Sequence, residues 1–105
     1  MSVKIVITRL FKAEKIEAAY QLLAELRSKA TVQNGYLSGE TLVSADNPHK
    51  VVVVSSWLSR KRWDEWYSSP KRAAFSEKIA PLLDAPESYE VFLVGRTSPE
   101  WVHMA

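Results

Sequence analysis

The residues of this chain best suited to chemistry lie in one short segment, residues 55–75, which reads SSWLSRKRWDEWYSSPKRAAF. A segment that mixes aromatic and cationic side chains in this way could stack nucleic-acid bases, enclose a flat organic ligand or fill a core beneath an amphipathic helix. Its aromatic residues are Trp57, Trp63, Trp66, Tyr67 and Phe75, and its cationic residues are Arg60, Lys61, Arg62, Lys71 and Arg72.

The spacing of the aromatic residues leaves two of these interpretations open. Trp63, Trp66 and Tyr67 follow one another at i, i+3 and i+4, so they share one face of a helix. Such a stripe usually fills space against a sheet. A short helix that breaks and restarts can also leave an aromatic-lined cleft over the end of a sheet. The stripe is therefore either packed core or one wall of a ligand pocket.

The charges in the same segment argue against nucleic-acid binding. The cations fall on predicted helices and alternate with Asp64 and Glu65, which is typical of a solvated face. The strand expected at residues 50–57 (KVVVVSSW) is aliphatic, whereas an RNA-binding sheet needs exposed aromatic and basic residues there. The formal net charge is only +2. We therefore expect no nucleic-acid partner.

Metal, thiol and nucleotide chemistry lack the residues that they need. The chain has no cysteine and only two histidines, His49 and His103, which lie in unrelated segments. It contains no H-x-x-x-H, G-x-S-x-G, G-x-G-x-x-G or phosphate-loop pattern. The sequence therefore predicts no metal site, no disulfide and no nucleotide-binding loop.

Length and composition predict a single domain over residues 1–105. Of the 105 residues, 47% are hydrophobic and 25% are charged, which is ordinary for a globular protein. There is no secretory signal pattern, and no apolar run approaches the roughly 20 residues that span a bilayer. We expect a cytoplasmic protein that does not enter a membrane.

Hydrophobic periodicity predicts the elements that must position the aromatic segment. Strands are expected at residues 2–11, 36–44, 50–57 and 89–97, and helices at 13–30, at 60–67 and from 70 onward. Ser59 and Ser69 are the expected helix N-caps, with Pro70 in the first turn of the last helix. The order βαββααβ is that of a ferredoxin-like α+β fold with a four-stranded antiparallel sheet, followed by an irregular tail at 98–105.

The predicted sheet has more apolar surface than its helices can cover. The run from Val51 to Val54 is apolar on both faces of its strand, and so are Ile5 and Val6 on the first strand. Helices on one face would leave the other face exposed, with an apolar patch that is large for a monomer. The simplest partner is a second copy related by two-fold symmetry, so we predict a homodimer.

The sequence resembles the antibiotic biosynthesis monooxygenase (ABM) family. The resemblance is carried by VVVVSSWLSRKRWDEWYSSPKRAAF, by the preceding NGYLSGETL and by the opening VKIVITRLF, and it extends to about Gly95. It implies a dimeric α+β barrel. The family includes oxygenases that need no cofactor and act on phenolic or quinol-like compounds, and it also includes haem-degrading enzymes.

The haem-degrading members resemble one another in an Asn on the first strand, a Trp on the helix before the break and an axial His. Here Trp66 occupies the Trp position, whereas Thr8 stands in place of the Asn and Ser76 in place of the His. Because the iron ligand is missing, haem degradation is disfavoured.

The resemblance thus implies a monooxygenase that acts with O₂ on a small aromatic or quinol-like compound and needs no cofactor. Trp66 and Phe75 would form apolar walls of the substrate site, and Thr8, Arg72 or Ser76 would reach its edge. No residue stands out as the catalytic base. The alternative is a non-catalytic homodimeric module of the same fold that binds a small ligand.

Overall fold

The structure, a computed structural model, describes residues 1–95. Its strands are β1 (Val3–Leu10), β2 (Tyr36–Val43), β3 (Lys50–Trp57) and β4 (Ser88–Leu93). Its helices are α1 (Ile16–Ala30), α2 (Arg60–Tyr67) and α3 (Pro70–Ile79), with short 3₁₀ turns η1 (Ala13–Lys15) and η2 (Ala80–Leu82). The predicted order of elements is confirmed. The last strand ends at Leu93 rather than at residue 97, and the predicted tail at 98–105 lies outside the described residues.

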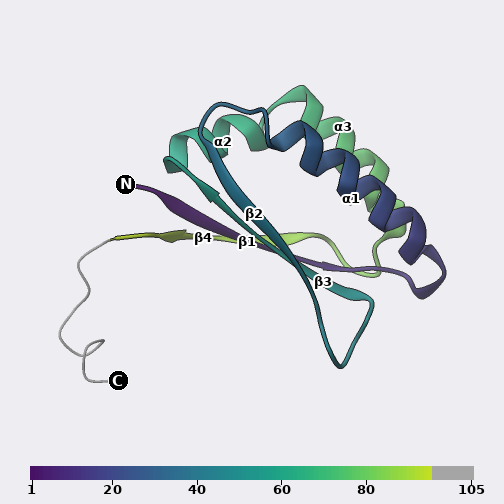
Figure 1. The fold of residues 1–105 in the computed structure, drawn as a ribbon. Helices are drawn as coiled ribbons and strands as arrows, with labels where there is room; N and C mark the ends of the chain where they lie inside the picture. The colour runs from purple at the N-terminus through teal and green to yellow at the C-terminus, as the bar shows by residue number, and fades with distance from the viewer. Residues whose placement is uncertain (96–105) are drawn as a thin grey trace, which may run out of the picture.

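The four strands form one antiparallel sheet in the order β2-β3-β1-β4. All three α-helices lie on one side of this sheet (Figure 1), which gives the predicted ferredoxin-like α+β fold. Strand β1 is central, and its Ile7 pairs with Val53 of β3 and with Tyr89 of β4. Residues paired in this way point to the same side of the sheet, so the register fixes which side chains face the helices.

The helix-covered face of the sheet carries the core. Along β1, Val3, Ile5 and Ile7 are buried, and Trp57 of β3, the partner of Val3, is 1% exposed. The helices bury their apolar stripes against this face, as amphipathic helices on a sheet do. The buried residues that they contribute are Ala19, Leu26, Trp63, Trp66, Phe75 and Ile79.

The opposite face of the sheet is partly apolar and has no helix over it within residues 1–95 (Figure 1). Val52 and Val54 of β3 lie on this face, where Val52 pairs with Thr8 of β1 and with Leu42 of β2. Leu42 is 43% exposed and Phe92, on the same face of β4, is 45% exposed. We refer to this surface as the open face.

Serine caps set the break between α2 and α3. The Ser59 hydroxyl accepts a hydrogen bond from the backbone N–H of Arg62 at 3.2 Å, and the Ser69 hydroxyl accepts one from Arg72 at 3.3 Å. Pro70 is the first residue of α3, where its missing N–H is not needed. The predicted caps are therefore confirmed, and they start two short helices above the end of the sheet.

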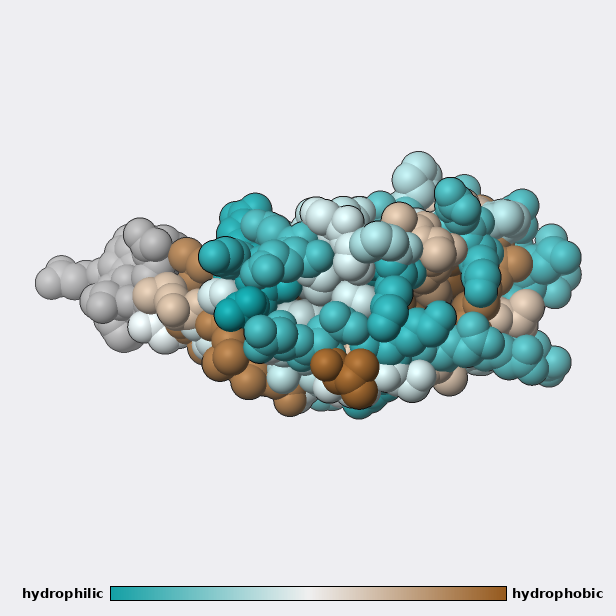
Figure 2. Space-filling view, turned by 90° about the horizontal axis from the view of Figure 1, so that it is seen from above, coloured by the Kyte–Doolittle hydropathy of each residue, from teal (hydrophilic) through white to brown (hydrophobic). Residues whose placement is uncertain are grey.

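The side of the molecule on which the helices lie is largely hydrophilic, with smaller apolar patches (Figure 2). None of the helices in residues 1–95 combines the length and the apolar character needed to cross a membrane.

Candidate functional site

A cavity of about 60 Å³ lies between the helix-covered face of the sheet and the helices. Residues of β1, β2 and β3 form one side of it, and residues of α1, α2 and α3 form the other. Three tryptophans line it: Trp57 at the end of β3 and Trp63 and Trp66 on α2. We call it the tryptophan cavity.

The three indoles form one packed group. The rings of Trp57 and Trp66 are stacked, with centroids 6.4 Å apart and planes 21° apart. Trp63 meets the edge of Trp57 at 5.8 Å. The indoles are buried as well as cavity-lining, with Trp66 5% exposed and Trp63 1% exposed. The two interpretations of the aromatic stripe, core and pocket wall, therefore both apply to Trp63 and Trp66, whereas Tyr67 is 37% exposed and does not line the cavity.

The polar wall of the cavity consists of two buried arginines that share one carboxylate. Arg9 donates from Nε to Glu87 Oε2 at 2.9 Å, and Arg72 donates from Nη2 to Glu87 Oε1 at 2.6 Å. The side chains of Arg9, Arg72 and Glu87 are 1%, 2% and 12% exposed. Arg9 and Arg72 line the tryptophan cavity, whereas Glu87, which accepts hydrogen bonds from both, is not part of its lining.

Burial and charge act in opposite directions on this cluster. Burial raises the pKa of the Glu87 carboxyl, but the charges of Arg9 and Arg72 and their hydrogen bonds outweigh it and hold that pKa below its usual value. Burial lowers the pKa of Arg9, and the Glu87 charge offsets part of that effect. An arginine remains protonated under such conditions. The cluster therefore carries two positive charges and one negative charge.

Two buried hydrogen-bond donors on side chains that line the cavity have no acceptor among residues 1–95. They are Arg9 Nη2 and Trp63 Nε1, both on side chains that are 1% exposed. By contrast, Trp57 Nε1 donates to the Ser55 hydroxyl at 3.2 Å. Buried N–H groups are nearly always paired, so these two mark a place where the described chain leaves donors unsatisfied.

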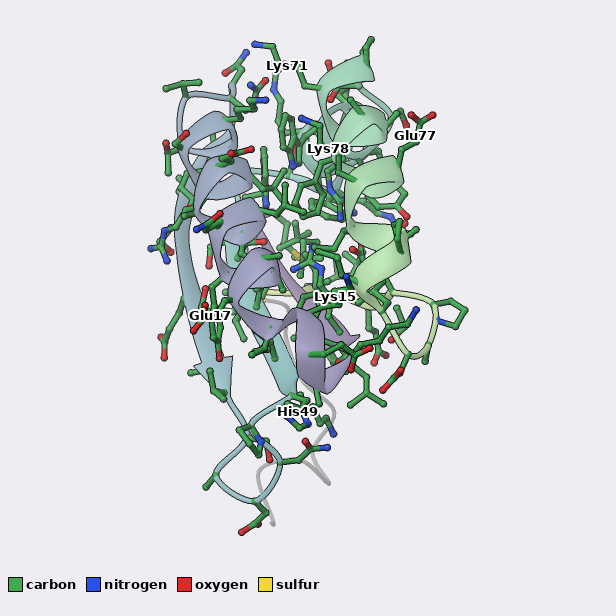
Figure 3. The ribbon with its side chains drawn as sticks, turned by 90° about the vertical axis from the view of Figure 1, so that its right-hand side faces the viewer. Lys15, Glu17, His49, Lys71, Glu77 and Lys78 are labelled. Carbon is green, nitrogen blue, oxygen red and sulfur yellow. The ribbon has the colours of Figure 1, made fainter. Side chains whose placement is uncertain are left out.

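The sequence leaves two placements for Arg72, the solvated face of its helix and the edge of the predicted pocket, and the first of these is wrong because Arg72 is buried. Lys71 and Lys78 do lie on the exposed side of α3 (Figure 3). Arg72 instead precedes Phe75 by three residues and Ile79 by seven, and this spacing places it on the inner face of the helix. Its charge is tolerated there because Glu87 accepts from it.

The structure brings together only part of the predicted substrate site. Trp66 and Arg72 line the tryptophan cavity, as expected. Phe75 packs behind them, with its ring centroid 5.2 Å from the Arg72 guanidinium. Ser76 accepts a hydrogen bond from Arg72 Nη1 at 2.9 Å but opens on a separate surface depression of about 440 Å³.

Thr8 does not reach the tryptophan cavity. It alternates with Ile7 along β1 and pairs with Val52, so its side chain lies on the open face. The prediction that Thr8 would reach the edge of a pocket between the sheet and the helices is therefore corrected.

The sequence interpretation missed Arg9 and Glu87. Arg9 could have been found, because it continues the inward-facing series of Val3, Ile5 and Ile7 along β1 and is thus a cation on an apolar face. Glu87 has no comparable local signal. It lies in the segment before β4 and is 78 residues from Arg9 in the chain.

The family model described as antibiotic biosynthesis monooxygenase matches residues 2–78. The chain belongs to this family. No curated protein matches it significantly.

Solved structures of low sequence identity share the fold. A conserved protein of Methanosarcina mazei superimposes with a TM-score of 0.83 at 15% identity, covering 88% of this chain and 91% of its own. Rv0793 of Mycobacterium tuberculosis gives 0.83 at 20% identity, with 94% and 100% covered. SnoaB of Streptomyces nogalater, a cofactor-independent oxygenase, gives 0.76 at 15% identity, with 93% and 97% covered. At these identities the likeness shows the fold alone.

Proposed function

We propose that this chain is a monooxygenase that needs no cofactor and uses O₂ to oxidise a small aromatic or quinol-like compound in the tryptophan cavity. The observation that carries the proposal is the meeting of three indole rings with the buried positive charge of Arg9 and Arg72. The family of the chain and the activity of the structurally similar SnoaB support it.

In such a reaction the substrate supplies the electrons. An ionised anthrone passes one electron to O₂, and the resulting radical and superoxide combine to form a carbon–oxygen bond. The peroxide takes up the proton that the substrate released and then loses water to leave a quinone. One oxygen atom enters the quinone, and the other leaves as water with both hydrogens of the methylene group. The protein contributes an apolar enclosure for the rings and positive charge for the anion.

We assign no catalytic base to this chain. Glu87 is the carboxylate that pairs with the two cavity-lining arginines, and these guanidinium partners keep its pKa low, which makes it a poor proton acceptor. A suitable substrate must therefore be acidic enough to ionise with the help of Arg9 and Arg72, as anthrones and quinols are. Positive charge close to a phenol or enol lowers its pKa by favouring the ionised form.

Ligand entry requires the tryptophan cavity to widen. Its volume of about 60 Å³ is well below the ~300–1,000 Å³ of most ligand pockets. Arg27 of α1 is an exposed residue of the cavity lining, and its Nη2 donates to the backbone oxygen of Gly39 of β2 at 2.6 Å. We expect a flat ligand to enter by separating this exposed contact between α1 and β2.

A homodimer formed across the open face is part of the proposal. Val52, Val54, Leu42 and Phe92 lie on that face, and strands of a second copy would bury them as the helices bury the other side. With both faces covered, the sheet that forms one side of the tryptophan cavity would be held rigidly.

A non-catalytic homodimeric module that binds a small ligand is the alternative. It is favoured by the small volume of the cavity and by the lack of an assigned base. The same residues would then bind a ligand without reacting with it.

Oxygen uptake separates the two functions. With an anthrone as substrate, the wild-type protein is expected to consume oxygen faster than a protein-free blank and to form one quinone for each O₂ consumed. If no anthrone or quinol raises uptake above the blank, the oxygenase proposal fails and the binding module takes its place.

A further inference from the structure

The unsatisfied donors at the tryptophan cavity point to a ligand atom that accepts hydrogen bonds. Arg9 Nη2 and Trp63 Nε1 belong to different elements, β1 and α2, and both side chains line the same cavity. Neither has an acceptor among residues 1–95. A ligand oxygen that reached both donors would remove the free-energy penalty of leaving two buried N–H groups unpaired.

The charge around the cavity indicates that this oxygen is anionic. Both oxygens of Glu87 already accept hydrogen bonds from the two arginines, which leaves the Arg9–Glu87–Arg72 cluster with one excess positive charge. Buried charges are normally balanced by a counter-charge. Hydrogen bonds to an ionised acceptor are also roughly twice as strong as those between neutral groups. A carboxylate or phenolate therefore suits the site better than a carbonyl.

Both donors are held in place before any ligand arrives. Glu87 fixes Nε of Arg9 at 2.9 Å, and the Arg9 guanidinium lies 5.5 Å from the centroid of Phe75. The Trp63 ring packs against Tyr67 and Tyr89 at 5.4 and 5.3 Å. Donors that are fixed in advance need little ordering on binding, so they can select the charge of a ligand.

We propose that the tryptophan cavity binds its ligand through an anionic oxygen, a carboxylate or a phenolate, which accepts hydrogen bonds from Arg9 Nη2 and Trp63 Nε1. The rest of the ligand is flat and apolar, because the rings of Trp57 and Trp66 line the same cavity. This inference rests on the proposed function for the choice of cavity, and it adds the charge of the ligand and the residues that recognise it.

Two matched probes test the charge preference in the wild-type protein. The probes are 2-naphthoate and 2-naphthamide, which have nearly the same shape and differ in charge. Their binding is followed without oxygen by the quenching of tryptophan fluorescence. We expect 2-naphthoate to bind at least tenfold more tightly. Equal affinities, or no binding of either probe, would overturn the inference.

Variants then assign the preference to the two donors. Arg9→Met removes the guanidinium, and Trp63→Phe removes the indole N–H while it leaves the buried charges intact. Each is expected to reduce the preference for naphthoate several-fold. Arg60→Met, on the exposed side of α2, is the matched control and should keep it. Because Arg9→Met also removes a partner of Glu87, circular dichroism must show that it folds; if it does not, Trp63→Phe decides. A preference that survives in every folded variant of the pair would overturn the inference.

The outcome is separable from that of the oxygenase proposal. Naphthoate selectivity without oxygen uptake from any anthrone would keep the anion site and reject the oxygenase. Oxygen uptake without charge selectivity would keep the oxygenase and reject the anion site.

Discussion

Arg72 of α3 donates from Nη2 to Glu87 Oε1 at 2.6 Å, and this ion pair is almost completely buried. The second oxygen of Glu87 accepts from Arg9 of β1, so a single carboxylate joins a helix to the central strand. The cluster separates the tryptophan cavity, which the arginines line, from the surface depression that Glu87 lines. It has both a structural and a binding role in our account, and the two roles lead to different predictions.

Removing the shared carboxylate should destabilise the protein. Glu87→Gln keeps the size of the side chain but leaves two buried guanidinium groups without a counter-charge. Breaking a buried ion pair from one side costs about 3–5 kcal/mol. We expect a loss of that order in the free energy of unfolding, measured by urea denaturation. Glu77→Gln, on the exposed side of α3 (Figure 3), is the control and should change it by less than about 0.5 kcal/mol. A small effect of Glu87→Gln would show that the cluster contributes little.

The contribution of Glu87 should depend on pH in one direction. Its pKa in the folded protein lies below the ordinary value of 4.5, so the folded state binds this proton more weakly than the unfolded state. The stabilisation is therefore present above the unfolded pKa and is lost as the pH falls through the folded pKa. Urea midpoints of wild type and Glu87→Gln should differ by a constant amount from pH 7 down to about pH 5 and converge below about pH 4. A difference that stays constant down to about pH 2 would contradict this assignment.

A charge on the open face should dissociate the proposed dimer. Val52 lies on this face, whereas Val53 pairs with Ile7 and lines the tryptophan cavity. Val52→Asp should therefore give a folded monomer in sedimentation, because a buried unpaired carboxylate is unfavourable at an interface. Val53→Asp should instead destabilise the fold.

The matched control for the dimer is Val32→Asp, at a position that is 76% exposed in the segment between α1 and β2. It should leave the sedimentation of the wild type unchanged. A wild-type protein that sediments as an 11.9 kDa monomer at micromolar concentration would contradict the dimer.

We also expect no haem turnover. Ser76 stands where the haem-degrading relatives are expected to carry their axial histidine, and Thr8 lies on the open face. His49 lies in the turn between β2 and β3 (Figure 3) and does not line the tryptophan cavity. Titration with haem followed by a reductant should show no conversion to an open tetrapyrrole. A Soret band typical of axial histidine together with such conversion would refute this prediction.

Local signals predicted the fold well and the site in part. The serine caps and the alternation along β1 act within a few residues, so the sequence shows them directly. The alternation of β1 also places the side chains of Thr8 and Ile7 on opposite faces of the sheet. The family resemblance instead indicates a position for Thr8 at the pocket, and the structure shows that the alternation is the better guide. For Arg72 the charge pattern of the segment indicates a solvated position, whereas the family resemblance indicates the edge of the pocket, so the sequence alone does not decide between them. The partner of Arg72, Glu87, lies 15 residues away in the chain, and only the tertiary structure brings them together.

The central claim is that this protein uses O₂ to oxidise an aromatic ligand bound in the tryptophan cavity. The most direct test is to measure the rate of oxygen uptake by Trp66 variants with an anthrone as substrate. Trp66 lines the cavity and stacks on Trp57, so its loss should misplace the substrate, an error that can lower the rate about a hundredfold. Our account predicts a loss of that size in kcat/KM for Trp66→Ala and a smaller one for Trp66→Phe. It predicts unchanged uptake for Tyr20→Phe on the exposed side of α1, with all three variants folded by circular dichroism. Wild-type uptake at the background rate, or folded Trp66 variants as active as the wild type, would contradict it.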